Sequence, residues 1–139
     1  MKNRKLYYIL SYTWGILMVL AGLCVELVFK LLKIPVQKYG PCRVYRYGER
    51  WGGLSLGHTI IVSTNANEDT LNHEFGHSIQ NAIFGPIFVI LALLSAIRYH
   101  YFKIKIQNNK YHELPPYDSF WLERDASILG NTYIKYFEL

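Results

Sequence analysis

Residues 73–77 read His73-Glu74-Phe75-Gly76-His77, with two histidines four positions apart and a glutamate directly after the first. Side chains at this spacing lie one turn apart on the same face of a helix, so both imidazoles can reach one ion. The intervening glutamate is placed to accept a proton from water rather than to bind the metal. The pattern predicts His73 and His77 as ligands of one Zn²⁺ ion and Glu74 as the general base.

The surrounding sequence favours a helix over residues 66–84. Apolar residues recur there every three or four positions, as on one buried face of a helix. Asn65 is the expected N-cap, with an acidic residue three positions on. Gly85-Pro86 is expected to end the helix, because proline lacks an amide hydrogen and clashes with the preceding turn.

A catalytic zinc site needs a third protein ligand and an open position. The metzincin pattern would require glycine and histidine where Gln80 and Ile83 stand, and a site-2-type peptidase would require a downstream Leu-Asp-Gly that the chain lacks. Both classes are therefore excluded.

Glu123 is the preferred third ligand. It lies in the middle of a predicted helix, in the apolar and aromatic context Phe120-Trp121-Leu122, where an unpartnered carboxylate is unexpected. The alternative is a solvated glutamate that pairs with Arg124 or Lys135. Four other side chains remain candidates for the third ligand: His58, His100, His112 and Glu113.

An apolar run follows the basic N-terminus, from Leu6 to about Leu32, and its cleanest part is Ile9–Val25. With its ends this run is long enough to cross a bilayer. A cleaved signal peptide is the alternative, but the run is too long and no small-residue cleavage site follows it. We therefore expect an N-terminal transmembrane helix within residues 1–35, with Glu26 facing protein rather than lipid.

Residues 36–139 are predicted to form a second unit. Residues 38–63 combine β-branched residues with Gly48 and Gly52-Gly53, which predicts a β-hairpin or meander. A helix from about Ser119 to Leu129, ended by Gly130, is expected to carry Glu123, and a short helical tail covers residues 132–137. The predicted fold class is α+β: a transmembrane helix, the hairpin or meander, and a zincin-like helical core.

A second apolar run, Ile87 to Ile97, is too short to span a membrane alone. If it did cross, Glu123 would lie on the opposite side from His77. We therefore expect a turn at residues 84–86 that sends the apolar helix back antiparallel to the motif helix, as a hairpin that dips into or lies against the membrane.

The composition fits a membrane protein. Half of the residues (51%) are hydrophobic, only 18% are charged, and the formal net charge is +5, which suits an anionic lipid surface. The lysines and arginines are scattered rather than gathered in one stripe, so no nucleic-acid partner is expected. Lipid, and a peptide or protein substrate, are the expected partners, and a bacterial cytoplasmic membrane is the expected location.

The residues that surround the motif resemble the gluzincin class of zinc peptidases. In that class a downstream helix supplies a glutamate as third ligand, commonly in the pattern Glu-x-x-x-Asp. This chain has Glu123 at the first position and Ser127 at the last, so the resemblance implies a weaker hydrogen-bond partner for a ligand histidine. Residues 51–130 are also similar to a family of small, uncharacterised bacterial membrane proteins, on Trp51-Gly52-Gly53, residues 72–81, Phe84-Gly85-Pro86, residues 95–99 and Tyr117-Asp118-Ser119. This implies a minimal gluzincin core but no substrate.

The expected function is that of a membrane-associated zinc endopeptidase. A non-catalytic membrane protein with a structural or regulatory zinc site is the alternative, and a membrane scaffold without metal is a third. Residues 54–63 are expected to lie beside the cleft and to bind an extended peptide by β-addition. Four residues are candidates to stabilise the oxyanion: Tyr117, Tyr133, His112 and Arg124.

Overall fold

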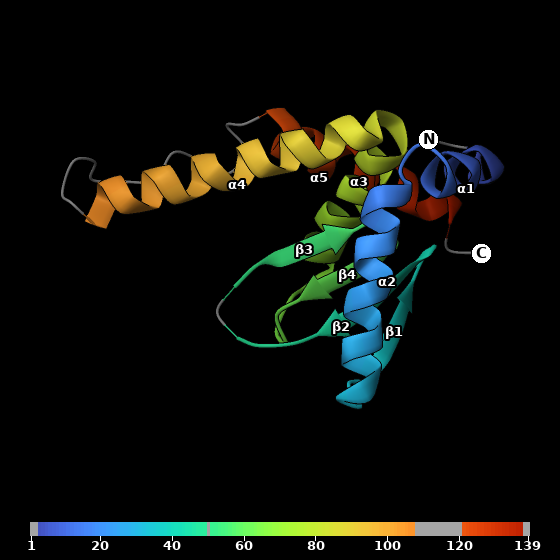
Figure 1. Ribbon diagram of the computed structural model, residues 1–139, viewed down its shortest axis with the longest axis horizontal. Coiled ribbons are helices and arrows are strands. Elements are labelled where there is room, and N and C mark those ends of the chain that lie inside the picture. Colours follow the sequence, from blue (N-terminus) through green and yellow to red (C-terminus); the bar gives the residue numbers. More distant parts are fainter. Residues whose placement is uncertain (1–2, 50, 108–120, 138–139) are drawn as a thin grey trace.

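The computed structural model describes residues 3–49, 51–107 and 121–137, which form a mixed α+β fold (Figure 1). In chain order the elements are α1 (Arg4–Tyr12), α2 (Ile16–Leu31), β1 (Val36–Tyr39), β2 (Cys42–Arg46), β3 (Gly53–Leu56), β4 (Thr59–Val62), α3 (Glu68–Phe84), α4 (Pro86–Gln107), α5 (Trp121–Tyr133) and the 3₁₀ helix η2 (Ile134–Tyr136). The predicted α+β class is confirmed.

The four strands form one sheet in the order β1-β2-β4-β3. The two hairpins, β1–β2 and β3–β4, are antiparallel, as a hairpin or meander requires. They are joined by a parallel pairing of β2 with β4, in which Val44 lies opposite Ile60, and a simple meander would not contain this pairing. As a result, β3 is an edge strand that follows directly on the loop at Gly52.

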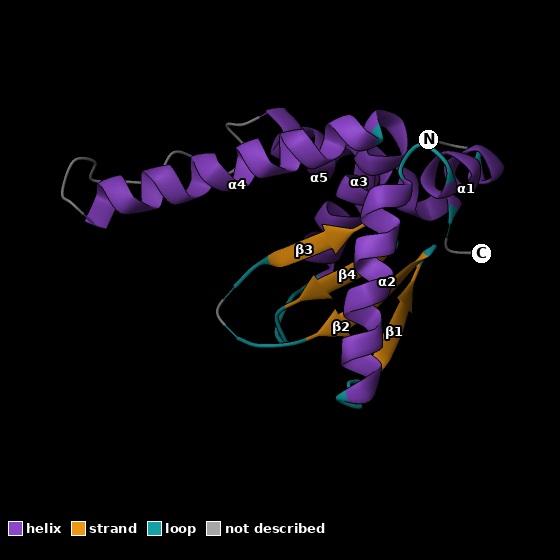
Figure 2. Ribbon diagram, viewed as in Figure 1, coloured by secondary structure: helices purple, strands orange, loops and turns teal. Residues whose placement is uncertain are grey.

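Helices cover both faces of the sheet (Figure 2). The face that carries Val44, Ile60 and Val62 packs against α3, and Tyr7 from α1 belongs to the same buried cluster. On the other face, Phe29 of α2 packs against Tyr45 and Ile61. The first helices therefore share a core with the segment predicted as the zincin-like unit.

The expected continuous helix over the first apolar run is wrong. Helix α1 ends at Tyr12, α2 begins at Ile16, and the two are bent by 81°. The Thr13 hydroxyl donates to the Ile9 carbonyl, and the Asn81 side chain of α3 donates to the Gly15 carbonyl. These side-chain hydrogen bonds stabilise the break between α1 and α2. Among the described helices none alone is long and apolar enough to cross a bilayer, although α1 and α2 together meet that length and composition.

Glu26 faces protein, as expected from its place in an apolar helix. Its side chain is buried and forms an ion pair with Arg43 of β2. The buried residues of α2, Val19, Gly22, Glu26 and Phe29, recur every three or four positions, so one face of this helix rests on the sheet. The buried carboxylate thus helps to fix α2 on the sheet rather than facing lipid.

The motif helix α3 begins two residues later than expected. Asn67, not Asn65, is the N-cap, and its side-chain oxygen accepts from the Thr70 amide. Asn65 instead accepts a hydrogen bond from the Ser63 hydroxyl. The helix ends at Phe84, and Gly85 turns the chain with a φ of 57°, a conformation that favours glycine.

Two other helix ends differ from expectation. Helix α4 continues to Gln107, well beyond Ile97, because residues 98–107 contain neither glycine nor proline. Helix α5 continues through Gly130 to Tyr133, so this glycine does not end the helix. The expected start of this helix, at about Ser119, lies outside the described residues.

Candidate metal centre

Three predicted ligands, two on α3 and one on α5, meet at one point. Nε2 of His73 lies 3.0 Å and Nε2 of His77 2.9 Å from the same oxygen, Oε2 of Glu123. These three side chains are the group of potential metal ligands found among the described residues, with ligand atoms within 4.8 Å of one another. The structure therefore brings together the two histidines of the motif and the preferred third ligand.

The far nitrogen of each histidine is also occupied. Nδ1 of His73 lies 2.7 Å from the Ser127 hydroxyl, and Nδ1 of His77 lies 2.8 Å from Oε1 of Gln80. Gln80 in turn donates to the Leu122 carbonyl of α5 at 2.7 Å. A partner at Nδ1 fixes the ring orientation and leaves Nε2 free to bind a metal.

Helices α3 and α5 approach so closely that glycine is needed at their contacts. A Cβ atom built on Gly76 would lie 1.7 Å from the Ala126 carbonyl oxygen, and one built on Gly130 would lie 1.6 Å from the Asn72 carbonyl oxygen. The two contacts run in opposite directions along the chain, so the helices are antiparallel. This close approach brings Glu123 within reach of both histidines.

A fourth side chain reaches the cluster from α4. The Ser95 hydroxyl donates a hydrogen bond to Oε1 of Glu123, the oxygen that does not face the histidines. Phe88, also on α4, is 2% exposed and its ring lies 6.0 Å from that of His77. Two side chains of α4 thus reach the cluster, but in Figure 1 the far end of this helix extends well beyond α3. The antiparallel hairpin therefore stays a prediction.

Glu74, the predicted base, is buried on the same helix as the two histidines. It is 4% exposed, and its carboxylate packs over the backbone of Gly53, where a Cβ atom would lie 2.7 Å from Oε1. Burial raises the pKa of the Glu74 carboxyl above its ordinary value, although His77 and His73 act in the opposite direction. A raised pKa suits a carboxylate that must accept a proton.

The carboxylate of Glu123 and the imidazole of His77 each offset the effect of burial on the other's pKa. Burial by itself would raise the pKa of Glu123, but its hydrogen bonds with His73 and His77 hold that pKa well below the ordinary value. Burial would lower the pKa of His77, yet the hydrogen bond to Glu123 and the nearby Glu74 carboxylate raise it. The metal-free cluster therefore favours an ionised Glu123 beside a protonated His77, and a metal must displace the proton of His77 to bind there.

The donor set fits zinc. Two imidazole nitrogens and one carboxylate oxygen form a common ligand set of catalytic zinc, which leaves the fourth position open. Ligands about 2.0 Å from a tetrahedral ion are about 3.3 Å apart, whereas the histidine–glutamate separations here are 3.0 and 2.9 Å. A small outward movement of Oε2 would therefore admit the ion.

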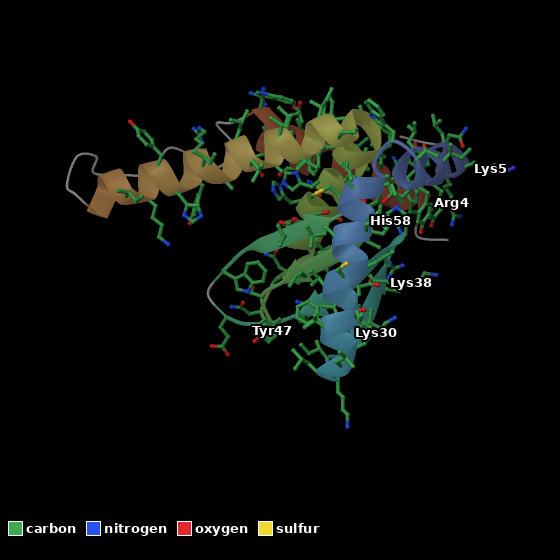
Figure 3. The ribbon with its side chains drawn as sticks, viewed as in Figure 1. Arg4, Lys5, Lys30, Lys38, Tyr47 and His58 are labelled. Atoms are coloured by element: carbon green, nitrogen blue, oxygen red, sulfur yellow. The ribbon has the colours of Figure 1, made fainter. Side chains whose placement is uncertain are left out.

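The other candidate ligands do not join this cluster. His58 is 2% exposed and lies under α1, where its ring stacks on Tyr7 at 5.2 Å (Figure 3). Burial and Arg43 lower the pKa of His58 to about 4. His100 is an exposed residue of α4 whose ring contacts Tyr99. His112 and Glu113 lie outside the described residues.

The alternative pairing of Glu123 with Arg124 or Lys135 is not found. Glu123 is buried and points to the histidines, whereas Arg124 and Lys135 are exposed. Among the oxyanion candidates, Arg124 follows Glu123 directly, and Tyr133 lies ten residues further along α5, about 15 Å at helical rise. Tyr117 and His112 lie outside the described residues.

Gln80 and Ser95 are site residues that sequence reasoning missed. Gln80 carried a signal, because it lies one helical turn after His77 and therefore on the same face. Ser95 carried another: it is the only polar side chain in the apolar run 87–97. A polar residue inside such a run needs a partner.

Comparison of the chain with protein-family models, with curated proteins and with solved structures found no match. The gluzincin resemblance therefore rests on the residues of the site alone and stays a prediction.

Proposed function

We propose that this chain is a zinc-dependent endopeptidase that works at a membrane. One observation carries the proposal: two histidine nitrogens and one glutamate oxygen converge at 2.9–3.0 Å, while a second, buried glutamate lies on the motif helix between the histidines. This combination of three ligands and a nearby carboxylate is the one that metal-assisted hydrolysis of a peptide bond requires.

In the proposed reaction His73, His77 and Glu123 would hold one zinc ion. When bound, zinc lowers the pKa of a water molecule towards neutrality and polarises the substrate carbonyl. Glu74 would take a proton from the attacking water as the water oxygen bonds to the peptide carbonyl carbon, and would return that proton to the amine nitrogen as the C–N bond breaks. The side chains of His73 and His77 keep 13% and 11% of their surface exposed, so neither histidine is fully sealed from solvent.

The edge strand β3 is the proposed substrate platform. Its antiparallel partner is β4 on one side, and the strand order leaves its other edge without a partner strand in the described sheet. Gly53, at the start of β3, touches Glu74. An extended peptide that added to this edge would pass close to the base, as β-addition to a sheet edge allows.

Lipid is the proposed partner of the outer faces of α2 and α4. Large apolar side chains on these helices are between 44% and 63% exposed, or 75% for Leu31. They include Leu17, Leu20, Leu23, Leu27 and Leu31 on α2, and Ile87, Ile90, Leu93, Leu94 and Ile97 on α4. Exposed apolar surface on this scale marks an interaction site. Arg4, Lys5 and Lys30 lie at outer ends of α1 and α2 (Figure 3), where cations meet anionic headgroups.

Zinc content and cleavage together test the catalytic proposal. The detergent-purified protein should bind one zinc ion per chain and cleave a library of quenched fluorescent peptides. Glu74→Gln should abolish cleavage and keep the zinc, whereas Glu68→Gln, an exposed change on the same helix, should alter neither. Absence of zinc after chelator-free purification would refute the proposal.

The burial of Glu74 supports a second candidate, a structural or regulatory zinc site, because a buried base is harder for a substrate to reach. This candidate predicts that the wild type and Glu74→Gln each bind one zinc ion and that neither protein cleaves a peptide. It also predicts that Glu123→Ala releases the zinc and lowers the melting temperature, since a structural ion contributes directly to folding.

Flotation with vesicles of mixed neutral and anionic lipid tests the membrane part. The wild type should float with the vesicles, and Leu93→Glu on α4 should reduce the bound fraction. Ile128→Glu is a matched control, because Ile128 is equally exposed but lies on α5. Equal loss for both variants, or no binding by the wild type, would contradict the assignment of this surface to lipid.

A further inference from the structure

Helix α4 donates a hydrogen bond to the candidate metal centre through the hydroxyl group of Ser95. Two apolar residues close to Ser95 in the sequence, Leu94 and Ile97, are 51% and 63% exposed. Ser95 is half-buried between them and donates to Oε1 of Glu123. In Figure 1 the far end of α4 extends well beyond α3 and the sheet.

The Glu123 carboxylate depends on this donor. Glu123 is 4% exposed, its Oε2 faces both histidines, and Ser95 is the hydrogen-bond donor found for Oε1 among the described residues. A buried charged oxygen without a partner carries a large desolvation cost. Without Ser95, rotation of the Glu123 carboxylate would lower this desolvation cost, because both of its oxygens could then accept hydrogen bonds from the histidines.

Serine in an apolar helix usually bonds back to a carbonyl of its own preceding turn. Here the hydroxyl instead crosses to another helix, and no other polar side chain occurs in the run 87–97. The position therefore serves the carboxylate rather than the stability of α4.

We propose that Ser95 is a positioning residue for the metal: by holding Oε1 of Glu123 it directs Oε2 alone toward His73 and His77. Metal affinity then depends on where α4 lies, because the hydroxyl moves with that helix. This inference rests on the proposed zinc site, but not on peptide cleavage.

The proposed role of Ser95 is tested by the zinc affinity of the full chain in detergent, measured by competition with a chromogenic chelator. Ser95→Ala should weaken binding about tenfold to a hundredfold, the usual effect of losing an outer partner of a ligand. Ser95→Thr keeps the hydroxyl and should stay within a few-fold of wild type. Ser11→Ala removes a hydroxyl that is fully buried in α1 and has no hydrogen-bond partner among the described residues, and it should leave zinc affinity unchanged.

Cobalt absorption provides a second readout that a purely structural role would not change. With Co²⁺ in place of zinc, Ser95→Ala should shift the visible bands, since the carboxylate changes its binding mode, and Ser95→Thr should restore them. Wild-type affinity and spectrum in Ser95→Ala would overturn the inference while leaving the zinc site intact. Equal weakening in the alanine and threonine variants would also overturn it. A wild type without zinc would overturn the proposed function itself.

Discussion

Replacing Gly76 by alanine should separate α3 and α5, the two helices that carry the three candidate metal ligands. Alanine favours a helix interior over glycine by about 1 kcal/mol, so this change would stabilise an isolated α3. In the folded chain, however, the new Cβ atom would lie 1.7 Å from the Ala126 carbonyl oxygen and 2.5 Å from its carbonyl carbon. The structure therefore predicts the opposite sign from helix propensity.

The size of the effect follows from the same contact. An ordinary Cβ contact begins at 3.4 Å, so α5 must retreat by about 1.7 Å at Ala126. Glu123 lies one turn earlier on the same helix and would move with it, whereas zinc–ligand distances tolerate about 0.2 Å. We expect a loss of about 1–3 kcal/mol in stability from overpacking, and zinc binding weakened about a hundredfold or more, beyond the loss of an outer partner.

Thermal unfolding of the metal-free protein and chelator competition measure the two effects. Gly52→Ala is the matched control, because a Cβ atom there meets nothing within 4 Å. The control should bind zinc like the wild type. If Gly76→Ala bound zinc with unchanged affinity and melted at a higher temperature, helix propensity would dominate, and the close approach of α3 and α5 would be refuted.

Other predictions concern single contacts. Ser127→Ala should weaken zinc binding about tenfold to a hundredfold in a competition assay, because Nδ1 of His73 loses its partner. The pKa of His58 is about 4 in the fold, against 6.5 ordinarily. The unfolded chain therefore binds more protons below pH 6.5, and the metal-free protein should lose stability as the pH falls towards 4, by about 3 kcal/mol for this shift. His58→Phe should remove that part of the pH dependence in unfolding experiments at pH 7 and pH 4. If the wild type and His58→Phe lost the same stability between these two pH values, His58 would not be the group responsible. Arg43→Met should lower the unfolding free energy by about 3–5 kcal/mol, since it leaves the Glu26 carboxylate buried without its partner, whereas Glu26→Gln should cost much less.

Local patterns were sufficient for the motif helix. The spacing of His73 and His77 is a property of one helix turn, so the sequence alone placed both rings on one face. Glu123 could also be chosen from the sequence as the third ligand, because a carboxylate in an apolar helix needs a partner. The buried ion pair of Glu26 follows from the same reasoning.

Features set by contacts distant in sequence could not be predicted in this way. Hydropathy describes residues 6–32 as one apolar run, while the bend at Gly15 depends on a hydrogen bond from Asn81, which lies on α3. The parallel pairing of β2 with β4 likewise depends on how two hairpins meet, and neither hairpin encodes it alone.

Gly130 shows how one residue supports two interpretations. Taken with the residues before it, a glycine at the end of an apolar pattern indicates a helix stop. In the structure it belongs to a stripe with Ala126, four residues earlier, that lets the α5 backbone rest on Gly76 and Asn72 of α3. Glu123 and Ser127 have the same four-residue spacing on α5, and their partners His77 and His73 have it on α3. The antiparallel register that matches the small residues therefore also brings the carboxylate and the hydroxyl to the two histidines. Small residues at this spacing, next to polar residues at the same spacing, are a signal that a sequence can carry for such a site.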